Sequence, residues 1–216
     1  MSVRNPKHIY HMKKIIILAA ALLVAVAPLS AQTKKEVKSA KSEAAAAAKT
    51  IKKDKFKMVE LGDIKDRLEQ FFIKVNSGCP QVVGLSEGCV TANLAKMTAI
   101  NNAANEYASN AGGTVRGRIT SDASTISGEQ IDALIAAYER LVLKEIKGEL
   151  VPFITLMRQN KKGEYDVRVY CIVDYETAHQ ARLRAMQRAL EETQMAEKYG
   201  SQISNWIDEG FEKIGK

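Results

Sequence analysis

The stretch that decides the fold is LVPFITLMRQNKKGEYDVRVYCIVD, residues 150–174. Both ends of it are rich in aliphatic and aromatic residues, and the polar segment 159–163 separates them. The Asn and Gly of that segment accept the positive φ angles that a tight turn requires. In the second half apolar residues recur at every other position, as in a strand. These residues are Val167, Val169, Cys171 and Val173. We therefore predict two antiparallel strands, over 150–158 and 164–174.

The segments before and after this hairpin have apolar residues at helical spacing. Ser127 followed by Gln130 matches a capping box, which marks the start of one helix. The inner face of an earlier helix is mostly alanine, so this helix can approach its neighbour closely. That face holds Met97, Ile100, Ala103, Ala104, Tyr107, Ala108 and Ala111. The predicted helices cover residues 63–75, 91–110, 127 onward, 175–199 and 201–211, the last containing Trp206.

Glycines and prolines divide the rest of the chain. Residues 76–88 carry both and are predicted to form a loop. Gly112 and Gly113 are predicted to end the alanine-rich helix, and the β-branched segment 114–120 is predicted to be a strand. Residues 139–148 fit either a helix end or the start of a strand. The order of elements predicts an α+β domain, a small antiparallel sheet with helices packed on one face and a long C-terminal helix.

The N-terminal region has the layout of a bacterial secretory signal. Two lysines precede an unbroken apolar run over 15–27, and small residues follow it up to Ala31. A membrane span needs about 20 apolar residues, so this run is too short for one. We predict a signal peptide over 1–31, with Met12 as an alternative start. The mature protein is then expected in the periplasm or, alternatively, at the outer membrane or outside the cell.

The formal net charge of +7 is unevenly distributed along the chain. Residues 1–31 carry +4 and residues 32–57 carry +6, which leaves −3 for residues 58–216. A nucleic-acid-binding domain would carry its positive charge on the folded body, so we exclude that function. Segment 32–57 is rich in Lys and Ala and poor in large apolar residues, so we predict a flexible tail with some nascent helix. Contact of this tail with anionic phospholipid or polysaccharide is an alternative role. A single domain is expected over 58–216.

Three cysteines follow the signal region. Disulfides persist outside the cytoplasm, and Cys79 and Cys89 flank a short segment of Gly and Pro, so we predict a disulfide between them. Closing this loop would stabilise the fold by about 2–3 kcal/mol. Cys171 lies on the apolar face of its strand and is predicted to be a buried, reduced thiol.

Few side chains of this sequence suggest catalysis. His179, the one histidine after residue 31, is predicted to pack in the last long helix rather than to catalyse. Arg182 projects from the alanine face of that helix. We expect its guanidinium either to extend to solvent or to meet a carboxylate across the interface or, alternatively, to bind an anion or a partner. Four aspartates have a spacing that does not indicate a shared site, namely Asp122, Asp132, Asp166 and Asp174. No catalytic, cofactor-binding or metal-binding motif is predicted.

Two segments together resemble a known family. MTAINNAANEYA (97–108) runs into TVRGRI (114–119), and GEYDVRVY (163–170) precedes an Ala/Arg-rich helix. Over residues 90–190 this pattern resembles the LPP-twenty-like family of bacterial envelope proteins and, more distantly, the N-terminal domain of the flagellar assembly protein T. The resemblance implies an α+β domain in the periplasm or at the outer membrane, without an established enzymatic role. Many members are lipoproteins, whereas no cysteine follows the apolar run of this chain, so a lipid anchor is not expected.

These observations predict an exported cell-envelope protein that is a non-catalytic binding or scaffolding module for an envelope protein or a cell-wall component. The alternatives are a periplasmic carrier of a small apolar ligand and a periplasmic enzyme of unknown reaction. A closed apolar cavity would favour the carrier, and two facing carboxylates in a deep pocket would favour the enzyme. An exposed sheet edge or an apolar patch would favour the interaction module.

Overall fold

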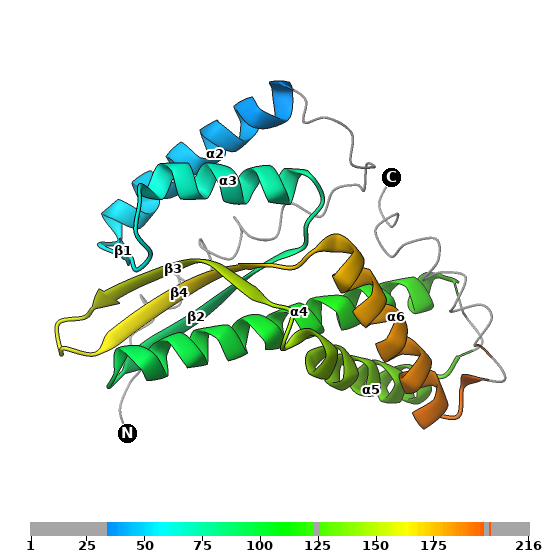
Figure 1. Ribbon diagram of the computed structural model, residues 1–216. Helices are drawn as coiled ribbons and strands as arrows, with labels where there is room; N and C mark the ends of the chain where they lie inside the picture. Colours follow the sequence, from blue (N-terminus) through cyan, green and yellow to red (C-terminus); the bar gives the residue numbers. More distant parts are fainter. Residues whose placement is uncertain (1–33, 123–125, 197–198, 200–216) are drawn as a thin grey trace.

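The chain folds around a four-stranded antiparallel sheet, which confirms the α+β class. A computed structural model describes residues 34–122, 126–196 and 199 (Figure 1). In chain order, the helices and strands of these residues are α2 (Lys34–Lys53), β1 (Lys57–Met58), α3 (Ile64–Asn76), β2 (Gln81–Cys89), α4 (Ala92–Asp122), α5 (Gly128–Ile146), β3 (Val151–Gln159), β4 (Tyr165–Ile172) and α6 (Tyr175–Glu192).

The predicted hairpin forms the centre of the sheet, whose strand order is β1-β3-β4-β2. Asn160 closes its turn: the side-chain oxygen accepts hydrogen bonds from the backbone N–H groups of Lys162 (2.9 Å) and Glu164 (3.1 Å). Gly163 has a φ of 81°, in the left-handed region that glycine tolerates. The positive φ predicted for the turn is confirmed at Gly163, whereas Asn160 has no positive φ and contributes through its side chain.

Helices cover both faces of the sheet, not one face as predicted (Figure 1). On one side α4 packs against β2 and β4, and α5 and α6 pack beyond it. On the other side α2 and α3 pack on each other and on the central strands, with Phe71 between Phe153 and Tyr170. Each face of β4 consequently contacts a separate hydrophobic core.

The predicted flexible tail is corrected by α2, a helix that packs along α3. Its small side chains bury one stripe, spaced as a helix face requires. The buried residues are Ala40, Ala44, Ala48 and Ile51. Leu68 and Phe71 of α3 are fully buried in the same core. The segment was predicted to be a tail because its own apolar area is small. The large apolar side chains of α3 provide the buried area that the alanines of α2 do not have.

β2 occupies most of the segment that we predicted as a loop, and Gly84 shows why. A Cβ atom on Gly84 would collide with the carbonyl oxygen of Ala99 in α4. The glycine therefore permits close packing of helix on strand rather than a turn. Ala95, Ala99 and Ala103 line the facing side of α4 and are fully buried, which confirms the predicted close approach of this alanine-rich helix.

The helix α4 does not end at Gly112 and Gly113, where a stop was predicted, but runs on to Asp122. A Cβ on Gly112 would collide with the side chain of Glu139 in α5, so this glycine also marks a close contact. Val115 and Ile119 follow it on the buried side of α4. The predicted strand over 114–120 is therefore wrong. Each of the two glycines destabilises a helix by about 1 kcal/mol relative to alanine, and the burial of α4 side chains against α5 more than offsets this cost.

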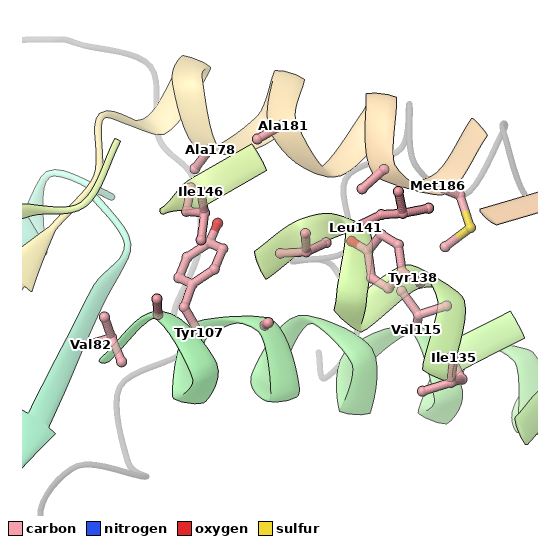
Figure 2. Close-up of a cluster of buried hydrophobic side chains, with 14 of the residues drawn as sticks. Val82, Tyr107, Val115, Ile135, Tyr138, Leu141, Ile146, Ala178, Ala181 and Met186 are labelled. Atoms are coloured by element: carbon pink, nitrogen blue, oxygen red, sulfur yellow. The ribbon is translucent and has the colours of Figure 1, made fainter. Parts of the chain in front are cut away.

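The second half of the molecule follows the sequence closely. Ser127 and Gln130 form the predicted capping box, and α5 continues to Ile146, so the ambiguous segment 139–148 is helical up to that residue. Asp174 caps α6, which ends at Glu192, earlier than predicted. Figure 2 shows the core that α4, α5 and α6 enclose. The predicted signal peptide and the predicted helix over 201–211 lie outside the described residues.

Candidate functional site

The predicted disulfide does not form, because its two cysteines lie at opposite ends of β2. Cys79 precedes the strand and Cys89 ends it. Nine extended residues span about 30 Å, whereas a disulfide needs Cα atoms within about 7 Å. Cys171 is buried as predicted, and this burial raises the pKa of its thiol to about 12. The error follows from reading a strand as a loop.

His179 and Arg182 both lie on α6, and neither joins a catalytic arrangement with the other groups described. The His179 ring stacks on Tyr175 one turn away, with ring centroids 6.1 Å apart. The Nε atom of Arg182 is buried. Burial raises the pKa of the hydroxyl of Tyr138, an interior residue drawn in Figure 2, and the charge of Arg182 acts against that shift. The anion or partner contact predicted for Arg182 stays a prediction.

The aspartates considered as a shared site serve different local contacts. Asp132 of α5 pairs with Arg116 of α4 at 2.6 Å. Asp166 of β4 accepts hydrogen bonds from Arg158 Nε (2.9 Å) and from a backbone N–H of β2. Asp174 caps α6. These three carboxylates belong to different surroundings, and the side chain of Asp122 lies outside the described set.

An arginine pair on the α2 side of the sheet was not predicted. The guanidinium groups of Arg158 and Arg168 both lie over the ring of Phe56, at 4.6 and 4.4 Å from its centroid. Arg168 also pairs with Asp54 at 3.1 Å, and Arg158 donates to the Asp54 carbonyl at 2.9 Å. These contacts join the end of α2 to the two central strands. Their chemistry is that of a structural clamp, since each charged group already has a partner.

The first two turns of α4 present an apolar ridge, which we define as Val90, Leu94 and Met97. Leu94 is 48% exposed and Met97 is 56% exposed. Residues three apart on a helix are neighbours, so these two side chains form one surface. Val90 comes directly before Thr91, whose hydroxyl accepts the Leu94 N–H at 3.2 Å and caps the helix. The ridge is therefore held on a rigid element.

Met97 was predicted to face the core, and its exposure has a simple cause. The end of α5 lies opposite Asn101 and Ala104, where Lys147 and neighbouring residues line a cavity of about 350 Å³ between the two helices. Met97 lies one turn before that point, and α5 packs along the later part of α4 only (Figure 1). The apolar face of α4 thus continues past the helix that covers it.

β2, beside the ridge, is an edge strand of the sheet. In the part of the chain that the structure describes, it pairs with β4 and has no strand on its outer side. The Leu85 carbonyl accepts a hydrogen bond from the Asn102 side chain at 2.7 Å, which occupies one acceptor near this edge. Leu85 itself is exposed. An exposed strand edge and an apolar ridge are the features expected of an interaction module.

A second cavity, of about 520 Å³, lies beside β1 and β3 and is lined by Lys55, Lys57 and Arg158 among others. Neither this cavity nor the one between α4 and α5 is a closed apolar chamber. Among the described residues, no three His, Cys, Asp or Glu side chains are grouped to hold a metal ion. No helix in the same residues has the length and apolar character of a membrane span.

No protein-family model, curated protein or solved structure matches this chain. The function must therefore be inferred from the chain's own surfaces. Among the described residues, the apolar ridge is a feature that packing within the fold leaves unexplained.

Proposed function

We propose that the protein is an exported cell-envelope protein that acts as a non-catalytic binding or scaffolding module. Its partner, an envelope protein, docks on the apolar ridge of α4. The observation that carries this proposal is the exposure of Leu94 and Met97 side by side on a capped helix. Contiguous apolar side chains on a rigid element are typical of protein-binding sites.

The surroundings of the ridge support a protein partner. Asn93, Lys96 and Asn101 flank it with polar groups, the arrangement of an apolar centre and a polar rim that interfaces share. Flexible aliphatic side chains such as methionine adapt to the shape of a partner. A cell-wall polymer offers few apolar groups, so the ridge favours protein over the cell-wall alternative.

The envelope location is supported by the sequence of the N-terminal region and by the resemblance to the LPP-twenty-like family. Both point to export, and the resemblance also points to a role without catalysis. The carrier and the enzyme remain alternatives, but no observation on the two cavities or on the described carboxylates favours either of them.

Site-specific photo-cross-linking in living cells tests the proposal. A photoreactive side chain is placed at Met97 and, as a matched control, at Val151, which is 57% exposed at the start of β3. We expect a discrete protein adduct from position 97 and none from position 151. The same adducts from both positions, or none from position 97, would contradict a partner on the ridge.

A further inference from the structure

The loop after β1 presents a second apolar feature, at the opposite edge of the sheet from the ridge. Leu61 is 101% exposed, so its side chain touches almost nothing in the folded chain. Val59, two residues earlier, is half exposed. β1 and β2 are the two edge strands of the sheet, so this loop and the ridge belong to opposite edges.

The exposed leucine is held in place by the residues on both sides of it. The Val59 N–H donates to the Thr155 carbonyl at 2.9 Å, and the Glu60 carboxylate accepts the Thr155 N–H at 2.9 Å. On the other side Asp63 caps α3 by accepting the Lys65 N–H at 2.7 Å. Only Leu61 and Gly62 lie between these anchors. The loop therefore projects Leu61 outward as a fixed feature of the fold.

The chain that leads into this projection is rich in lysine. Four exposed lysines precede it, namely Lys52, Lys53, Lys55 and Lys57. Lys55, Lys57 and Val59 line the same hollow beside β3, so charged and apolar groups share one surface. Two acids of this segment are partly buried and have partners in the fold: Asp54 pairs with Arg168, and Glu60 accepts from the backbone of β3. In the residues directly after Leu61 the exposed acids are Asp63, which caps α3, and Asp66, so the four lysines make the surface that precedes Leu61 basic.

We propose that this basic loop surface, formed by Lys52, Lys53, Lys55, Lys57, Val59 and Leu61, docks peripherally on an anionic phospholipid bilayer. Leu61 and Val59 enter the boundary between head groups and acyl chains, and the lysines contact the phosphate groups. The long lysine stems let the ammonium groups stay at head-group level while the leucine lies deeper.

The chemistry of the surface favours lipid over other anionic partners. A fully exposed aliphatic side chain gains free energy only where an apolar medium receives it, and a bilayer supplies that medium without a shaped pocket. An acidic polysaccharide would bind the lysines but would leave Leu61 in water. The proposal does not rest on the proposed protein partner, because the ridge takes no part in it.

Co-sedimentation with vesicles tests this docking, using the protein as isolated from the cell envelope. The vesicles are pure phosphatidylcholine, or a mixture of phosphatidylethanolamine and phosphatidylglycerol. The variants are Leu61→Asp, the double variant Lys55→Glu/Lys57→Glu and, as a matched control, Val151→Asp. Thermal melts verify that each variant is folded, which is expected because all four side chains are exposed.

We expect binding to anionic vesicles by the wild type and by Val151→Asp, and weaker binding in high salt. Leu61→Asp should weaken binding about tenfold or more. The substitution removes the aliphatic side chain that enters the bilayer in the docked state, and it adds a charge of the same sign as the lipid. The double lysine variant should weaken it by a similar factor. Absence of wild-type binding, equal binding to neutral vesicles, or full binding by Leu61→Asp would overturn the proposal. The last result would indicate a purely ionic surface.

Discussion

The two faces of the sheet are covered in different ways. On the α4 face the contact is made by small residues, with Gly84 directly against Ala99 and no room for another carbon atom. On the α2 face the contact is made by large groups, with Phe71 among other rings and two guanidinium groups over Phe56. Backbone proximity fixes one layer, whereas aromatic and charged side chains fix the other. The predictions below test this difference, from the largest effect to the smallest.

Deleting α2, residues 34–53, should have the largest effect. The deletion uncovers Leu68 and Phe71, and it removes Ile51 from their core. We expect a loss of more than about 4 kcal/mol, or a fall in melting temperature of about 10 °C or more. Calorimetry measures this loss, and Ala45→Ser on the exposed side of α2 is the control. A change of only about 2 °C, as expected of a solvated tail, would contradict the claim that α2 is part of the layer that covers this face of the sheet.

Phe56→Ala should come next, because it removes the ring that two guanidinium groups contact. Phe56 is 7% exposed, so the substitution also leaves a cavity in the α2-side core. We expect a loss of about 3–4 kcal/mol in the free energy of unfolding. Urea denaturation measures it, with Lys57→Ala as the exposed neighbour that should change stability little. If Phe56→Ala changed the free energy of unfolding as little as Lys57→Ala, the contacts of the two arginines with Phe56 would contribute nothing to stability.

Gly84→Ala tests the α4 face. The added carbon meets backbone atoms of α4, which cannot rotate away, so we expect a loss of about 1–3 kcal/mol. Gly113→Ala is the matched control, because nothing lies within 4 Å of its Cβ position and alanine favours a helix. That control should gain about 0.5–1 kcal/mol. A gain in both variants, measured by thermal unfolding, would show that α4 does not approach β2 so closely.

His179→Ala should have the smallest effect on the fold and none on the cellular role. The half-buried ring loses its stack on Tyr175, which we expect to cost less than about 1 kcal/mol. An enzyme that used this histidine as a general base would lose about 10²–10⁴-fold in rate. Loss of the cellular role in a folded variant, assayed in a deletion strain, would therefore favour the enzyme over the interaction module.

The sequence predicts what local chemistry determines. The hairpin turn at Asn160 and the capping box at Ser127 are made by residues within four positions of each other, and the structure confirms both. The alternation of β4 is also confirmed, because period-two burial can be read from a single strand. What one strand does not show is whether its other face is also covered.

The sequence fails where a residue's role depends on a distant neighbour. Gly84 and Gly112 were interpreted as breaks in secondary structure, yet both permit close packing against α4 and α5 respectively. The alanines of α2 have too little apolar area for the sequence to predict their burial, and only the position of Phe71 beside them explains it. Met97 has helical periodicity typical of a core residue, and only the position at which α5 ends leaves it exposed. The candidate site was missed for that reason.

Hydrogen–deuterium exchange of the native protein, read at peptides from α2, tests the central claim most directly. The claim is that residues 40–51 form part of the folded domain and complete the second face of the sheet. The structure predicts slow exchange in these residues, comparable with that of α3, because both helices share one core. Exchange of residues 40–51 at the rate of an unfolded peptide, while α4 stays protected, would contradict it.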